Sequence, residues 1–171
     1  MPNVNPSPVI PAPISALALR AALGRFATGV TIVACVDAQG QPMGLTCNSF
    51  ASLSLDPPLV LWSLRLASAA LPAFDVAGHF SVNVLTEDQV GLSRRFAQAG
   101  DDKFDQGHWR AGLGGVPVLS GCAAVFECAL HSQQTAGDHR LYIGQVLRLT
   151  EHALAPLLFQ GGHYRMLGEV L

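Results

Sequence analysis

The feature that most constrains the fold is a series of short apolar segments, each rich in β-branched residues and each followed by Gly, Pro or Asp. Such segments, bounded by turn residues, are typical of β-strands. Strands are expected at 30–36, 43–50, 59–64, 79–85, 123–131, 141–150 and, last, near 164–167. About seven strands with a few short helices predict a mainly β (α+β) fold, a closed or partly closed barrel rather than a doubly wound sheet.

Helical signals interrupt the strands at three places, residues 15–27, 68–77 and 86–97. Ser15 and Ser68 are suitable N-caps for the first two. Thr86 and Gln89 match a capping box at the start of the third. The segment 100–120 contains five glycines and is expected to be a long ordered loop. Near the end of the chain, a Gly-Gly turn at 161–162 follows the apolar residues 157–159.

The composition favours one folded domain with little surface charge. Half of the 171 residues are hydrophobic and 13% are charged, against about 25% charged in an average protein. Residues 14–171 are predicted to form the domain, preceded by a Pro-rich arm at 1–13 that is disordered or draped over it. A net charge of −2 offers no basic field for nucleic acid or an anionic membrane.

The scarcity of charge also raises the question of what hides the apolar surface. The most apolar stretch, residues 57–74, contains Arg65 and three prolines, so no membrane span is expected. The N-terminus lacks the basic region of a secretory signal, which favours a cytoplasmic protein. A second copy of the chain is the ordinary way to cover such a surface, and a homo-oligomer is therefore expected.

The residues that direct side-chain catalysis requires are missing. The chain has no nucleophile elbow, zinc-protease helix motif or phosphate-binding P-loop. Its four cysteines form no C-x-x-C pair and its six histidines are scattered, so no metal site is predicted. Of the cysteines, Cys47 alone lies in a polar segment where it could line a site.

Two features instead suit a bound cofactor that carries a phosphate. Lys103 is the only lysine beside nine arginines, and it lies in the glycine-rich segment. There it is either a solvated charge or a partner for a phosphate. Short polar side chains also interrupt apolar strands, and each must bond either to backbone or to a ligand. These residues are Thr46, Asn48, Ser49, Ser63 and Ser68.

Several blocks together resemble the flavin reductase domain family, the reductase components of two-component flavin-dependent monooxygenases. The resemblance covers residues 19–167. It rests on ALGRFATGVT at 22–31, GLTCNSF at 44–50, SLDPPLV at 54–60, GHFSVNVL at 78–85, DKF at 102–104, GDH at 137–139 and PLLF at 156–159. Cys47 and Ala51 depart from the commoner pattern, in which Ala and Thr are usual.

The resemblance implies an FMN-binding split β-barrel with Greek-key-like order, a homodimer, and reduction of FMN or FAD by NADH or NADPH. It implies that reduced flavin then diffuses to a monooxygenase. The flavin-binding residues carried over from the matching blocks are Thr46, Cys47, Asn48, Ser49, Phe50, Ser63, Leu64, Ser68, Lys103 and Phe104. His139 and Tyr164 are expected on the nicotinamide side, although a hydrogen-bonded turn residue and a core aromatic are equally simple readings of them.

No residue is predicted to be catalytic, because hydride transfer between aligned cofactors needs no protein nucleophile. Two other functions are compatible with the residues. One is a flavin- or haem-binding sensor or carrier without turnover. The other is a different oxidoreductase on the same fold, acting for example on a metal–corrin or a pyridoxine phosphate.

Overall fold

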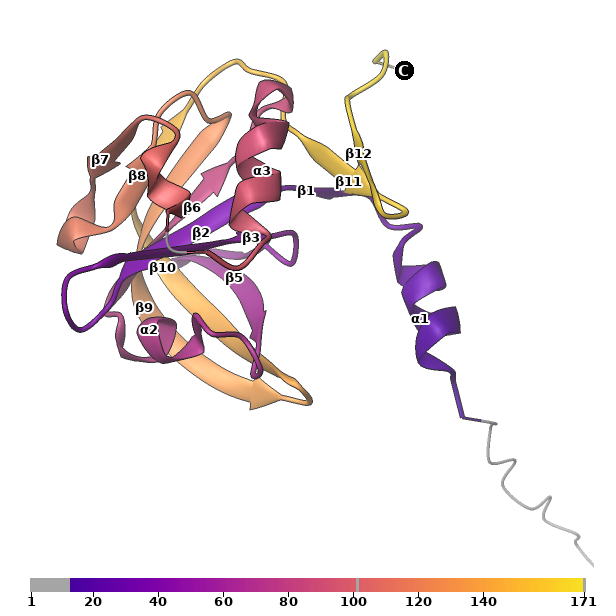
Figure 1. The fold of residues 1–171 in the computed structure, drawn as a ribbon, viewed down its shortest axis with the longest axis horizontal. Helices are drawn as coiled ribbons and strands as arrows, with labels where there is room; N and C mark the ends of the chain where they lie inside the picture. Colours follow the sequence, from indigo (N-terminus) through magenta and orange to yellow (C-terminus); the bar gives the residue numbers. More distant parts are fainter. Residues whose placement is uncertain (1–12, 101, 171) are drawn as a thin grey trace, which may run out of the picture.

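A seven-stranded antiparallel sheet forms the body of the protein (Figure 1). The structure is a computed structural model, and it describes residues 13–100 and 102–170. The strand order is β3-β2-β6-β9-β10-β5-β4. The strands are β2 Thr31–Val36, β3 Pro42–Cys47, β4 Ala51–Leu55, β5 Pro58–Arg65, β6 His79–Val84, β9 Ala124–Ala136 and β10 His139–Glu151.

The connection between the two edge strands forces the sheet to curl. In a flat sheet, β3 and β4 would lie roughly 29 Å apart, at about 4.8 Å per strand. They are nevertheless consecutive in the chain, and the segment from Cys47 to Ala51 spans at most about 14 Å when fully extended. The sheet therefore closes on itself around residues 48–50. The predicted mainly β, split-barrel class is confirmed.

Two apolar clusters stabilise this body. In the first, Trp62 of β5 stacks on Tyr142 of β10 with ring centroids 4.7 Å apart, and Phe74 of α2 (Leu71–Val76) meets the indole edge-on. The second lies under α3 (Val90–Phe96), whose Phe96 is 1% exposed. The site described below lies where α3 meets the edge strand β3.

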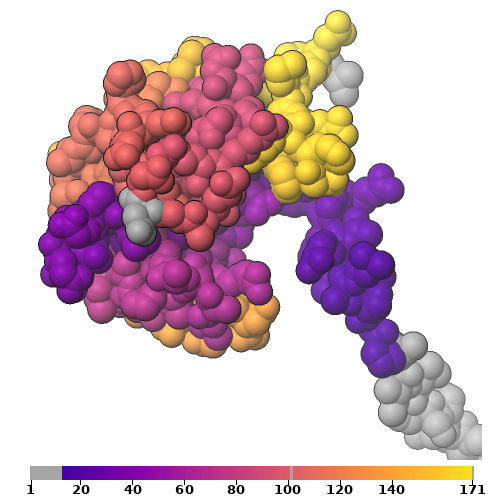
Figure 2. All heavy atoms as spheres, viewed as in Figure 1, coloured from indigo at the N-terminus to yellow at the C-terminus, as the bar shows by residue number. Residues whose placement is uncertain are grey.

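The three predicted helices are present, although shorter than the sequence suggested. Ser15 caps α1 (Ala16–Leu23) by accepting a hydrogen bond from the Ala18 amide at 3.1 Å. The capping box of Thr86 and Gln89 opens the 3-10 turn η1 (Glu87–Gln89), and α3 follows it directly. Helix α1 buries none of its residues and projects from the body (Figures 1 and 2).

The prediction of a loop at 100–120 is wrong, because this segment contains regular structure. It holds the 3-10 turns η2 (Lys103–Asp105) and η3 (Leu113–Gly115) and a hairpin of β7 (Trp109–Ala111) with β8 (Pro117–Leu119). Gly114 has φ +64°, and a Cβ there would lie 2.7 Å from Nδ1 of His79, which explains one of its glycines. The many glycines concealed strands that are too short to show a periodic pattern.

Other strand limits also differ from the prediction. The strand expected at 43–50 ends at Cys47, and a separate strand, β4, begins at Ala51. At the C-terminus, β11 (Leu158–Gln160) and β12 (His163–Arg165) form a small sheet with β1 (Thr28–Gly29). The predicted arm at 1–13 falls outside the described residues except for its last position. Within residues 13–100 and 102–170, no helix has the length and apolarity needed to cross a membrane.

Candidate functional site

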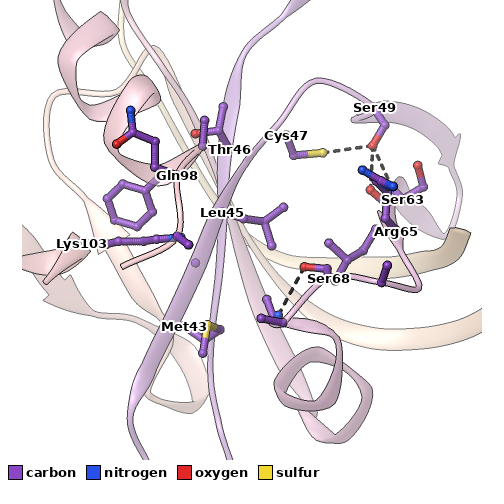
Figure 3. A pocket seen from close by; sticks show the side chains of 18 of the residues that line it. Met43, Leu45, Thr46, Cys47, Ser49, Ser63, Arg65, Ser68, Gln98 and Lys103 are labelled. Atoms are coloured by element: carbon purple, nitrogen blue, oxygen red, sulfur yellow. Dashed lines mark hydrogen bonds between the residues drawn. The ribbon is translucent and has the colours of Figure 1, made fainter. Parts of the chain in front are cut away.

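A pocket of about 810 Å³ opens between β3, the end of β5 and the end of α3 (Figure 3). Short side chains form much of its wall, which leaves room for a ligand of cofactor size. The lining comprises residues 43–49 of β3 and the turn after it, 63–65 at the end of β5, 67–70 after that strand, 96–100 at the end of α3, Lys103 and His139.

Nine of the twelve predicted binding residues line this one pocket. They come from four separate parts of the chain, which the curled sheet brings together. The nine are Thr46, Cys47, Asn48, Ser49, Ser63, Leu64, Ser68, Lys103 and His139.

Phe50, Phe104 and Tyr164 lie outside the lining of this pocket, and their contact with a ligand stays a prediction. Phe50 packs on Phe126 of β9, with ring centroids 5.5 Å apart. Phe104 lies behind the pocket wall, because a Cβ on Gly44 would come within 3.1 Å of its ring. The aromatic rings at these positions pack within the protein, and a sequence pattern does not separate such packing from ligand contact.

Hydrogen bonds centred on Ser49 join the turn after β3 to the end of β5 at the pocket. Its hydroxyl accepts from the Ser63 amide at 2.9 Å and lies 3.1 Å from the Ser63 carbonyl oxygen. Sγ of Cys47 lies 3.0 Å from the same hydroxyl, and burial raises the pKa of this thiol. Cys47 is therefore a neutral thiol that packs in the wall.

Another hydrogen bond fixes α3 against β3 on the opposite side of the pocket. The Thr46 hydroxyl donates to the Ser93 carbonyl oxygen at 2.6 Å. The Ser93 hydroxyl, in turn, lies 2.8 Å from Oη of Tyr164 on β12. This contact links β12 to α3, the helix whose C-terminal end forms part of the pocket wall.

Lys103 enters the pocket from the segment that follows α3. Arg95 of α3 holds that segment by an ion pair with Asp102 at 3.0 Å and by donating to the Lys103 carbonyl oxygen at 3.2 Å. Partial burial lowers the pKa of the Lys103 ammonium. A desolvated ammonium held in this way gains more from an anionic ligand than a fully hydrated one would.

His139 lies at the start of β10, beside the turn of the β9–β10 hairpin. Its Nδ1 is 2.8 Å from Oδ1 of Asp138, and this contact lowers the pKa of the Asp138 carboxyl. The Asp138 carbonyl accepts from the Leu66 amide at 2.9 Å, which ties the hairpin turn to the end of β5. The imidazole is therefore held at the pocket edge with Nε2 available to a ligand.

Sequence reasoning missed part of the pocket, most notably Arg65. This arginine follows Ser63 and Leu64 directly and lies opposite His139 in the β5–β10 register. Its position next to two predicted residues was the available signal. The small side chains at 67, 69 and 70 were also missed, because alanine carries no chemistry that a motif could reveal.

Two cationic side chains line the pocket, although the chain as a whole carries a small negative charge. Lys103 and Arg65 both line it, and no aspartate or glutamate does so among the residues described. The whole chain has a net charge of −2. Cations, hydroxyls and exposed backbone around an open volume of this size fit the phosphate and polar edges of a flavin nucleotide.

Comparison with known proteins agrees with this fit. The family model described as flavin reductase like domain matches residues 23–168. The chain belongs to this family. An FMN reductase (NADH) of Agrobacterium fabrum is 45% identical over 164 residues, covering 96% of this chain and 92% of the relative. The resemblance to flavin reductases inferred from the sequence is thereby confirmed.

A further relative and a solved structure link the family to its partners and cofactors. The reductase subunit of a flavin-dependent monooxygenase of Rhodococcus jostii is 42% identical, over 85% of this chain and 74% of that one. The NADH:FAD oxidoreductase of Streptomyces globisporus, solved with NAD and FAD fragments, superposes with a TM-score of 0.84. It is 36% identical, and the match covers 89% of this chain and 92% of the other.

Proposed function

We propose that this protein is an NAD(P)H-dependent flavin reductase that binds FMN or FAD in the pocket beside β3. The observation that carries the proposal is the cationic, acid-free lining of an 810 Å³ pocket, in a member of the flavin reductase family. Hydride transfer from the nicotinamide to the flavin is the chemistry that the bound cofactors supply. The protein contributes binding, alignment and exclusion of water.

In this proposal, different residues of the pocket hold different parts of the flavin. Thr46, Cys47, Asn48, Ser49 and Leu64 would surround the ring and the start of its side chain. Ser63 and Ser68 would meet the ribityl and phosphate oxygens, and Lys103 would offer its charge to the phosphate. The proposal is supported by the inward position of these residues and by the hydrogen bonds that fix Thr46 and Ser49.

His139 is proposed to contact the nicotinamide cofactor. Its contact with Asp138 leaves Nε2 as the ring atom free for a ligand. Tyr164 would assist through its hydroxyl contact with Ser93 on α3.

The proposal can be tested with the purified full-length protein and added cofactors. Under anaerobic conditions, FMN or FAD with NADH or NADPH should lose the visible absorbance of oxidised flavin at a rate that depends on protein concentration. Under air, oxygen reoxidises the reduced flavin, and the repeated turnover is followed by the loss of absorbance of the reduced nicotinamide. Absence of reduction with all four cofactor pairs would contradict the proposal.

We also propose that two copies of the chain associate. Helix α1 buries none of its residues, and its apolar side chains Leu17 and Leu23 are 78% and 63% exposed. An eight-residue helix is marginal alone in water, so it needs a surface to pack against. Light scattering should give the mass of a dimer for the wild type and that of a monomer for Leu17→Asp. A monomeric wild type would contradict this part.

Release of reduced flavin to a monooxygenase is part of the proposed role. Named relatives that are reductase components of such enzymes support it. We place this activity in the cytoplasm, because the four cysteines are buried free thiols, which suits a reducing compartment. A flavin-dependent monooxygenase supplied with this protein, NADH and FMN should turn over its substrate. Removal of the reductase should stop that turnover.

A further inference from the structure

We infer that Arg65 binds the pyrophosphate of the nicotinamide dinucleotide and so separates its subsite from that of the flavin phosphate. This inference rests on the proposed function. A flavin and a nicotinamide dinucleotide must occupy the pocket together for hydride transfer. Each brings at least one phosphate group, so the pocket has to accommodate two anionic centres at once.

Two cations line the pocket, and they lie on different walls. Lys103 follows α3, whereas Arg65 ends β5. Figure 3 draws them on either side of β3, with Leu45 between them. One cation is therefore available for each anionic centre, and with Lys103 proposed for the flavin phosphate, Arg65 is left for the second.

The position of Arg65 assigns it to the same cofactor as His139. The two residues face each other in the antiparallel register of β5 and β10. The next residue after Arg65, Leu66, donates its amide to the Asp138 carbonyl at 2.9 Å. The guanidinium and the imidazole are thus carried by one braced corner of the pocket, and a ligand that reaches His139 lies within the range of Arg65.

Arg65 has no carboxylate in direct contact among the described residues, although it lies near enough to Asp138 to help lower the pKa of that carboxyl. Among the described residues it forms no ion pair, whereas Arg95, Arg110, Arg140 and Arg148 are each paired with a carboxylate. A guanidinium has a planar fork of donors that matches two phosphate oxygens at once. Lysine would supply the charge at this position without the fork.

The test measures equilibrium binding of each ligand separately to Arg65→Gln, Arg65→Lys and the wild type. Calorimetry with ADP-ribose, which carries the pyrophosphate without the nicotinamide, should give a dissociation constant about tenfold higher for Arg65→Gln. Arg65→Lys should recover part of the loss. The FMN dissociation constant, from quenching of flavin fluorescence, should change less than twofold. Arg25→Gln, which removes an exposed arginine outside the pocket, should match the wild type.

Two results would overturn the inference. Equal ADP-ribose affinity in Arg65→Gln and the wild type would make Arg65 a solvated charge. A larger loss for FMN than for ADP-ribose would place it at the flavin phosphate instead. Either result leaves the proposed function standing if the wild type still reduces flavin, whereas failure of that reduction would remove the proposed function itself.

Discussion

Polar side chains occur in apolar strands in two regions of this molecule, and they serve different ends. Under the β7–β8 hairpin, Ser81, Asn83 and Glu127 are at most 1% exposed. Glu127 accepts from the Leu113 amide at 2.7 Å, and Asn83 accepts from the Leu119 amide at 2.9 Å. These groups fasten a segment of short strands to the sheet.

In the pocket, similar side chains are bonded but still face an open volume. Thr46 and Ser49 bond to backbone of α3 and β5, respectively, and both also line the pocket. Hydrogen bonding of a side chain to the protein therefore does not exclude its binding to a ligand. Residual exposure toward a cavity distinguishes a binding residue from a purely structural one.

The largest expected effect is on stability, at Glu127. This carboxylate lies 3.3 Å from a guanidinium nitrogen of Arg110 and 3.4 Å from one of Arg148. Glu127→Ala leaves the partly buried Leu113 amide unpaired and two guanidinium groups without their carboxylate, and should lower the free energy of unfolding by about 3 kcal/mol. Urea unfolding measures this change.

A matched control for Glu127 is Glu151→Ala at the exposed end of β10. That variant should stay within about 0.5 kcal/mol of the wild type. At a temperature where Glu127→Ala remains folded, it should still bind FMN normally. A cost at Glu127 no larger than that at Glu151 would contradict the structural role of this region.

The second effect is on flavin binding, at Lys103. Lys103→Gln should raise the FMN dissociation constant about tenfold, or ~1.4 kcal/mol, through loss of a charge-assisted hydrogen bond. The free energy of unfolding of Lys103→Gln should not fall below that of the wild type. The pKa of Lys103 is lowered below the usual 10.5, so the protonated form is disfavoured in the folded state. The unfolded chain binds more protons between the two pKa values, and stability therefore rises with pH in that window.

The same lowered pKa predicts a pH dependence of binding. FMN affinity of the wild type should decline in alkaline solution below pH 10.5, as the Lys103 ammonium loses its proton. In Lys103→Gln this decline should be absent. Fluorescence titrations of both proteins across this range measure it, and an identical profile in the two would remove Lys103 from the phosphate site.

The smallest effect is expected at Ser49, which both bonds to the protein backbone and lines the pocket. Ser49→Ala removes its bonds to the Ser63 backbone and to Cys47, and should cost about 1 kcal/mol of unfolding free energy. Ser52→Ala, on the exposed strand β4, serves as the control and should cost less than about 0.5 kcal/mol. Thermal unfolding compares them. An equal cost for the two would show that the Ser49 bonds to β5 do not stabilise the fold.

The sequence predicted the parts of the fold that repeat over several residues. The alternation and β-branching of 30–36 and 79–85 marked β2 and β6, and the Thr86 capping box marked the start of the third helical segment. The β7–β8 strands have three residues each, and their pairing depends on contacts with Asn83 and Glu127 from distant strands. A short strand fixed by long-range contacts leaves no periodic trace.

The residues of the site likewise divide into those that the sequence revealed and those that it did not. Polar residues inside apolar strands, such as Thr46 and Ser49, stood out because burial without a partner is costly. Lys103 stood out because it is the only lysine. Arg65 did not, since one of nine arginines at a strand end is ordinarily a solvated charge, and only the register with His139 gives it a place.

Hydrogen–deuterium exchange with and without FMN tests most directly whether the pocket beside β3 is the flavin site. Saturating FMN should slow exchange of the amides at 44–49, 63–65, 67–70 and 97–100, which line it. The amides of the β7–β8 hairpin, at 109–119, should exchange at the same rate in both samples. Protection of the hairpin with no change at 44–49, 63–65 and 67–70 would contradict the assignment.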